Sequence, residues 1–234
     1  RQGEKNAVKY ADEIIVLSKG VQDYFERAYG RKTHFIPNGV NRPAIRQSKL
    51  ITDKFALTKD SYILFLGRLV PEKGIRYLVE AFKEVKTDKK LVIAGGSSDT
   101  DDFTAELKNL AKGDDRIIFT GFVQGKLLDE LYSNAYLYTL PSDLEGMPLS
   151  LLEAMSYGNC CLVSDIPECT EVVEDKAIIF KKSDVSDLKK KLQEACEQPE
   201  TVKRLKEQAA DYICRKYNWD DVVKETVKLY RRDI

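Results

Sequence analysis

The chain has 234 residues, of which 43% are hydrophobic, and its 38 lysines and arginines balance 38 aspartates and glutamates. This balance excludes the basic excess of a protein that coats nucleic acid, so we expect no nucleic-acid partner. No apolar run approaches the roughly 18 residues of a membrane span, so we expect no transmembrane segment. An anionic ligand would therefore need a local cationic site. Because the chain begins with Arg1 and not Met, we expect a fragment of a longer protein.

The first 42 residues predict a small α/β unit. A strand is expected over Glu13–Leu17, a helix over Lys19–Tyr29, a second strand over Thr33–Ile36, and a turn at residues 37–39. Two strands do not make a stable sheet alone, so we interpret residues 1–42 as the remnant of another, N-terminal domain. Residues 43–59 are polar and weakly periodic, which predicts a linker.

Residues 60–215 alternate between apolar, β-branched runs and segments of helical period. The expected strands are Tyr62–Leu66, Lys90–Ala94, Arg116–Thr120, Ala135–Leu140, Cys160–Ser164 and Ala177–Phe180. The expected helices between them include Ile75–Val85, Phe103–Ala111, Lys126–Ser133 and Leu149–Tyr157. Near-continuous apolar strands separated by helices predict an α/β fold with a doubly wound, Rossmann-like parallel sheet. In such sheets ligands bind outside the carboxyl ends of the strands.

The last part of the chain, residues 216–234, predicts an amphipathic helix over Asn218–Asp233. Its apolar side carries Val222, Val223, Val227 and Tyr230. We expect this helix to pack back towards the N-terminal part.

The chain has five cysteines, an odd number, and their spacing contains no CxxC pair. They are Cys160, Cys161, Cys169, Cys196 and Cys214. This pattern favours reduced thiols in a cytoplasmic protein over zinc ligands or a disulfide framework.

The loop after the first strand of the sheet, residues 67–74, brings two cations to a helix N-terminus. Arg68 and Lys73 lie just before a helix N-terminus, whose free N–H groups and partial positive charge favour an anion. The loop therefore suits a diphosphate. The alternative is that both are solvated surface charges. The loop lacks the Gly-Lys-Ser/Thr ending of a P-loop, and the chain has no GxGxxG, which argues against a dinucleotide-binding dehydrogenase.

The loop and helix after the fourth strand, residues 141–155, carry a second set of candidate residues. Gly146 lets a ligand approach the backbone, and Pro148 suits the first turn of a helix. Glu153 lies in an otherwise apolar helix, where its carboxylate needs partners such as ligand hydroxyls. The alternative is that Ser150, Glu153 and either Ser156 or Tyr157 form a thin solvated stripe.

Here the sequence resembles glycosyltransferase family 4, the group 1 glycosyl transferases of GT-B fold. Glu145 and Glu153 match the E-x7-E motif of retaining glycosyltransferases, and the runs EGMPLSLLEAM and GRLVPEKG are similar to the family. So are ADEIIVLSKGVQDYF, IPNGV, IIFTGFV and YNWDDVVKETVKLY, which follow in the family's order. The resemblance covers essentially the whole chain and implies the C-terminal, donor-binding half of a GT-B enzyme.

The resemblance also implies roles for individual residues. Arg68 and Lys73 would bind the diphosphate, Glu145 the donor sugar and Glu153 the ribose, and Arg68, Lys73 and Glu145 would be the catalytic residues. The backbone N–H groups of Met147 and Leu149 would face the phosphates. The same cleft would be lined by Gly67, Gly95, Gly96, Gly121, Phe122, Val123, Gly146 and Pro148, with the residues at 121–123 near the base.

The implied function is that of a retaining glycosyltransferase, in which this chain holds the nucleotide-sugar donor and is inactive alone. Uridine and guanosine donors are both compatible, with UDP-sugars favoured slightly, and no metal or cofactor is expected. The acceptor is unknown, a role in polysaccharide or glycolipid synthesis is inferred from the family, and the whole protein would associate peripherally with a membrane. The alternatives are a nucleotide-binding module without activity, or a GT-B epimerase or phosphorylase.

Two further features receive structural interpretations. Asp99-Thr100-Asp101 matches the metal-binding DxD of the GT-A fold, but it lies in a polar loop, which predicts solvated side chains. His34, the only histidine, lies in an expected strand and is interpreted as structural.

Overall fold

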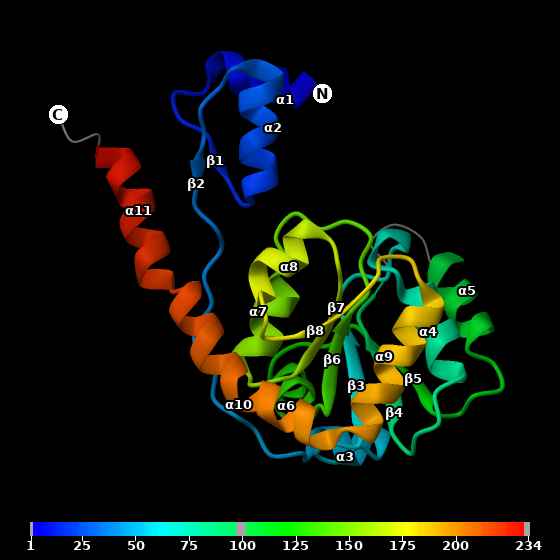
Figure 1. The fold of residues 1–234 in the computed structure, drawn as a ribbon. Coiled ribbons are helices and arrows are strands. Elements are labelled where there is room, and N and C mark those ends of the chain that lie inside the picture. The colour runs from blue at the N-terminus through cyan, green and yellow to red at the C-terminus, as the bar shows by residue number, and fades with distance from the viewer. Residues whose placement is uncertain (1, 97–101, 232–234) are drawn as a thin grey trace.

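The computed structural model describes residues 2–96 and 102–231. Asp99-Thr100-Asp101 lies outside the described residues. A large α/β part and a small N-terminal unit are joined by an extended connection, and the C-terminal helices run along one side (Figure 1).

The large part is built on a six-stranded sheet in which every neighbouring pair is parallel, in the order β5-β4-β3-β6-β7-β8. The strands are β3 (Tyr62–Leu66), β4 (Lys90–Ala94), β5 (Ile117–Gly121), β6 (Leu137–Leu140), β7 (Cys161–Ser164) and β8 (Ile178–Phe180). The first strand of this sheet in chain order, β3, lies at the centre, and the order reverses between β3 and β6. This topology confirms the predicted doubly wound sheet, and each predicted strand matches within two residues at either end.

Helices cover both faces of this sheet, because each parallel crossover needs one. They are η1 (Pro71–Lys73, a 3₁₀ turn), α4 (Ile75–Lys83), α5 (Asp102–Leu110), α6 (Lys126–Asn134), α7 (Leu149–Ser156), α8 (Pro167–Val173), α9 (Val185–Glu197) and α10 (Pro199–Lys216). Helix α4 packs against α5 and α9, and α10 packs against α7. The central strands are buried on both sides, with Tyr62, Ile63, Leu64 and Phe65 all fully enclosed.

The five cysteines are unpaired, and Cys160, Cys161 and Cys169 are buried. Burial raises the pKa of the Cys160 thiol to about 12, which keeps it protonated and inert. These thiols are core residues. Among the described residues there is no cluster of side chains suited to a metal ion, and we find no helix whose length and apolarity would let it span a bilayer.

The N-terminal unit contains α1 (Gln2–Tyr10), β1 (Ile15–Val16), α2 (Lys19–Tyr29) and β2 (His34–Phe35), with β1 parallel to β2. Ser18 caps α2 by accepting a hydrogen bond from the Val21 N–H at 3.3 Å, and Gly30 ends it in the left-handed conformation. His34 Nε2 lies 2.8 Å from Glu13 Oε2 on the surface, in keeping with a structural role. The sequence analysis did not foresee α1.

The expected linker, residues 43–59, contains a helix, α3 (Leu50–Phe55). Ile51 and Leu57 are fully buried in the core, and the Glu130 carboxylate accepts hydrogen bonds from the N–H groups of Lys49 and Ile51. The segment is therefore anchored to the large part although its composition is polar. The domain boundaries at residues 42, 59 and 215 stay a prediction.

Helix α11 (Trp219–Arg231) follows α10 after a break at Tyr217 and Asn218. At this break the chain bridges to the N-terminal connection, where the Val40 N–H donates to Tyr217 O at 2.8 Å. Beyond it, α11 has no buried residue and extends on the side where the N-terminal unit lies (Figure 1). The predicted apolar side of this helix is thus largely uncovered in this chain.

Candidate functional site

The candidate site lies where the strand order reverses, at the carboxyl ends of β3 and β6. Here the loops of residues 67–74 and 141–148 touch, since the Asp143 N–H donates to Glu72 O at 2.8 Å. Gly74 has φ +66°, and a Cβ placed on it would lie 1.9 Å from Pro141 O. Only glycine allows this contact. The two loops that the sequence analysis selected are therefore held together by the backbone.

This contact brings Lys73 and Glu145 together in an ion pair with an Nζ–Oε1 distance of 2.6 Å. The Lys73 side chain is 15% exposed and that of Glu145 is 6% exposed. Ser142 Oγ donates to the same Glu145 oxygen at 2.6 Å. The alternative of a solvated surface charge is wrong for Lys73. Arg68, in contrast, is exposed at the rim, and we find no ion-pair partner for it among the described residues.

A neighbouring aspartate fixes the Glu145 loop from the other side. Asp143 accepts hydrogen bonds from Tyr77 Oη at 3.0 Å and from Ser183 Oγ at 2.6 Å. Tyr77 belongs to α4, and Ser183 follows β8. Two elements far apart in the sequence thus hold the loop that carries Glu145. The sequence analysis missed this role of Asp143, because neither partner is near it in the chain.

The glycine pocket, a cavity of about 490 Å³, lies beside Arg68 at the ends of β3, β4 and β5. It is lined by Leu66, Gly67, Arg68, Gly95, Gly96, Phe122 and Val123. A Cβ on Gly95 would lie 1.8 Å from Gly67 O, and the Leu69 N–H donates to Gly96 O at 3.0 Å. The Phe122 side chain is exposed, so its ring offers a face to a flat ligand. Gly121 precedes it with φ +70°.

The start of α7 differs in one respect from the expectation. Pro148 precedes the helix with φ −77° and ψ 80°, and the Leu149 N–H donates to Met147 O at 2.9 Å. This is an inverse γ-turn. The Leu149 N–H is therefore occupied within the chain, and it does not lie free to face a phosphate. Gly146 is exposed, with no heavy atom near the position of a Cβ, so a ligand can approach its backbone.

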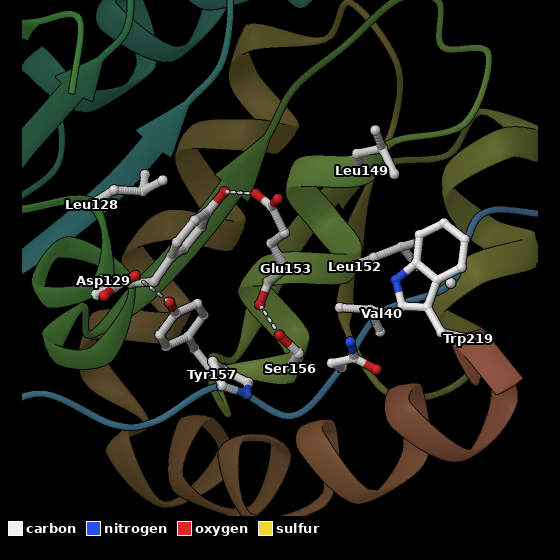
Figure 2. A pocket seen from close by; sticks show the side chains of 13 residues that line it. Val40, Leu128, Asp129, Leu149, Leu152, Glu153, Ser156, Tyr157 and Trp219 are labelled. Carbon is white, nitrogen blue, oxygen red and sulfur yellow. Dashed lines mark hydrogen bonds between the residues drawn. The ribbon is translucent and has the colours of Figure 1, made fainter. Parts of the chain in front are cut away.

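The second glutamate lines a separate cavity of about 430 Å³, the Glu153 pocket (Figure 2). Its walls come from α6, α7, the start of α11 and the N-terminal connection, and they include Val40, Leu128, Asp129, Tyr132, Leu149, Leu152, Ser156, Tyr157 and Trp219. Tyr132 Oη donates to Glu153 Oε2 at 3.1 Å. Burial against these walls raises the pKa of Glu153, and the bond from Tyr132 opposes that shift.

The alternative of a thin solvated stripe on α7 holds only in part, because Glu153 is exposed and Ser150 and Tyr157 are half-buried. Ser156 is buried and its Oγ donates to Glu153 O at 2.7 Å, while Ser150 Oγ accepts from the buried Tyr138 Oη at 2.8 Å. Glu153 is the most exposed of these four side chains, and it lines the pocket from the middle of α7 (Figure 2).

The loops and helices that follow the strands of the sheet carry three chemical features. Two cations and a helix N-terminus can meet the charge of a phosphate group. Two carboxylates eight positions apart, Glu145 and Glu153, can accept hydrogen bonds from hydroxyl groups. Two cavities with partly apolar walls can hold the flat and aliphatic parts of the ligand. This combination suits a ligand that carries phosphates, hydroxyls and a ring system.

Comparisons with known proteins identify the family to which the chain is similar. Residues 47–212 match the family described as Glycosyl transferases group 1. An uncharacterized glycosyltransferase of Methanocaldococcus jannaschii is 31% identical over 74% of this chain and 45% of its own length. The alpha-maltose-1-phosphate synthase of Mycolicibacterium smegmatis is 23% identical over 98% of this chain and 65% of its own. The chain therefore spans about half to two thirds of the length of these relatives.

Solved structures show the same fold. The Anabaena protein Alr3699/HepE, in complex with UDP and glucose, superposes with a TM-score of 0.90 at 18% sequence identity, covering 99% of this chain and 66% of that one. The likeness confirms the predicted fold class, a Rossmann-like half of a GT-B fold.

Proposed function

The chain belongs to the glycosyl transferases group 1 family, and from this premise we propose that it is the donor-binding part of a retaining glycosyltransferase of family 4. The proposed donor is a UDP-sugar. The observation that carries the proposal is the buried Lys73–Glu145 pair at the point where the strand order reverses, with the exposed Arg68 in the same loop as Lys73. The UDP and glucose bound by Alr3699/HepE, whose fold is similar, support the choice of donor.

In this proposal the diphosphate lies over Arg68 and Lys73. Sugar transfer leaves negative charge on the departing nucleoside diphosphate, and fixed cations lower the barrier by meeting that charge as it develops. Lys73 is fixed in advance, because Glu145 and the backbone contact at Gly74 hold it in place. Arg68 is free to adapt at the rim. The positive end of α7 adds to their effect. We assign no metal or cofactor to this role.

Glu145 is proposed to contact the donor sugar and Lys73 at once. Its Oε1 accepts from Lys73 and Ser142, so the second carboxylate oxygen is the one available to a sugar hydroxyl. Gly146, Met147 and Pro148 follow in the same loop and would lie beside the sugar. The proposed base position is over Phe122, next to Gly121 and Val123.

Glu153 is proposed to bind the ribose. Its carboxylate has a raised pKa because the pocket walls remove part of its hydration, although the side chain stays exposed to the cavity, and hydroxyl donors from a ligand would replace the lost hydration. On the family resemblance alone we further propose a cytoplasmic enzyme, peripheral at a membrane, that builds a polysaccharide or glycolipid on an acceptor not identified here.

The experiment that tests donor binding is thermal unfolding of the chain with UDP, GDP, ADP and NAD. A ligand that binds only the folded state adds about 2.7 kcal/mol of stability at 100 times its dissociation constant. We expect a clear rise in melting temperature with UDP and none with NAD. A rise in melting temperature with GDP alone would mean that the donor carries guanosine and not uridine. No rise with any nucleoside diphosphate would contradict donor binding by this chain.

A further inference from the structure

The Glu153 carboxylate has an unusual set of partners. Its hydrogen bond from Tyr132 Oη, at 3.1 Å, is the one that we find for its carboxylate oxygens within residues 2–96 and 102–231. No lysine or arginine in those ranges forms an ion pair with it. Glu153 is exposed to the cavity, so its carboxylate can keep its charge there without a cation. Glu153 is therefore held by a neutral donor, and its negative charge is left for a ligand.

Tyr132 itself is firmly placed. Its side chain is 1% exposed. Its ring stacks on that of Tyr157, with centroids 5.1 Å apart and an interplanar angle of 18°. Its main-chain oxygen accepts from Asn159 Nδ2 at 2.8 Å. The partner ring is fixed in turn, because Tyr157 Oη donates to Asp129 Oδ1 at 2.8 Å. The Tyr132 ring is therefore fixed, and its hydroxyl lies closer to Glu153 Oε2, at 3.1 Å, than to its other acceptor, Ser150 O, at 3.4 Å.

The bond from Tyr132 occupies Glu153 Oε2 and leaves Oε1 for the cavity. Figure 2 shows the Glu153 side chain lying between Tyr157 on one side and Leu152 and Trp219 on the other. A carboxylate fixed in this way can accept hydrogen bonds from two adjacent hydroxyl groups. Such bonds to an ionised acceptor are stronger than those between neutral groups.

We propose that Tyr132 is a positioning residue, which orients Glu153 so that the pocket selects nucleotides with an intact ribose diol. This inference rests on the proposed function, because it needs a nucleotide at the site. Tyr132 touches no ligand in this scheme; it acts through Glu153. Removal of its hydroxyl should therefore reduce the affinity for a ribonucleotide and leave the affinity for a nucleotide without ribose hydroxyls almost unchanged.

The test uses calorimetric titration of UDP and of 2′,3′-dideoxy-UDP into the wild-type chain and Tyr132→Phe. We expect the wild type to bind UDP more tightly than the dideoxy compound. In the variant, the affinity for UDP should fall about 10-fold, as the loss of a hydrogen bond to a charged group implies, and the affinity for the dideoxy compound should fall less than about 2-fold. Tyr136→Phe is the matched control. It removes another largely buried hydroxyl, which donates to Ala195 O at 2.7 Å outside the Glu153 pocket, and should change neither affinity.

A second comparison keeps the test decisive if Tyr132→Phe is unstable. Glu153→Gln leaves Tyr132 in place and should abolish the preference for UDP, and adding Tyr132→Phe to it should have no further effect on that preference. Equal losses for both ligands in Tyr132→Phe, or a wild type that binds both equally well, would overturn this inference and leave the proposed function intact. A wild type that binds neither ligand would contradict the proposed function itself.

Discussion

The buried ion pair between Lys73 and Glu145 makes a prediction about stability that does not depend on any ligand. Removal of one partner of a buried pair leaves an uncompensated charge and costs about 3–5 kcal/mol. Lys73 retains 15% exposure, and Ser142 would still donate to Glu145, so the lower end applies. Lys73→Met should therefore reduce the free energy of unfolding by about 3 kcal/mol, which for a chain of this size lowers the melting temperature by roughly 6–12 °C.

The assay is urea unfolding followed by circular dichroism, without nucleotide. Lys189→Met is the matched control, because Lys189 pairs with Glu84 on the surface, where both side chains are well exposed. Exposed pairs contribute less than about 1 kcal/mol, so this control should unfold almost like the wild type. A double variant, Lys73→Met with Glu145→Leu, should recover part of the loss because it leaves no buried charge. If Lys73→Met costs no more than Lys189→Met, the pair does not form in solution and Lys73 is not fixed in advance.

Three further predictions concern single residues around the site. Gly74→Ala should reduce the free energy of unfolding, measured in urea, by more than about 1 kcal/mol, because the new Cβ would clash with Pro141 O. Gly113 also has a positive φ, but the space around it is open, so Gly113→Ala should reduce the free energy of unfolding by less. An equal loss in both would refute the close contact. Arg68→Ala should weaken UDP binding by roughly 10-fold in calorimetry. Because Arg68 is exposed, the same change should alter the free energy of unfolding by less than about 0.5 kcal/mol. A large loss of stability would show that Arg68 has a structural partner. Burial raises the pKa of Glu153 above its unfolded value, so ionisation of this group destabilises the fold increasingly as the pH rises through the folded pKa. Glu153→Gln should thus melt higher than the wild type at pH 7, with the difference disappearing below about pH 4, and a difference independent of pH would contradict this cause.

The sheet and its two loops could be predicted from the sequence for a physical reason. Parallel strands buried on both faces are almost continuously apolar, so runs such as Tyr62–Leu66 are visible without an alignment. The topology then brings the loops after β3 and β6 together, which is where Arg68, Lys73 and Glu145 were expected to meet. The roles assigned to these residues remain proposals.

Other features depend on tertiary contacts that no local pattern contains. Helix α3 lies in a polar segment, and its formation depends on the burial of Ile51. It also depends on the hydrogen bond from the Ile51 N–H to the carboxylate of Glu130, which is 79 residues away from Ile51 in the chain. The salt bridge joins Lys73 to a residue 72 positions along the chain. The helix that contains Tyr132 was predicted, but its period alone does not show that the hydroxyl reaches Glu153 on the next helix of the same sheet face. A tyrosine on a largely buried helix, followed by a glutamate on the neighbouring crossover helix, is the signal that could have suggested the pair.

Arg68 and Lys73 are proposed to form the phosphate site of a nucleotide-sugar donor. The most direct measurement is calorimetric titration of UDP and of uridine into the wild-type chain and into the double variant Arg68→Ala with Lys73→Ala, below the melting temperature of the variant. We expect the variant to lose UDP affinity by about 100-fold or more, as the loss of two charge-assisted contacts implies, and to keep its weak affinity for uridine. Equal losses of affinity for UDP and for uridine would contradict the proposed phosphate site, because the two cations would then not bind the phosphates.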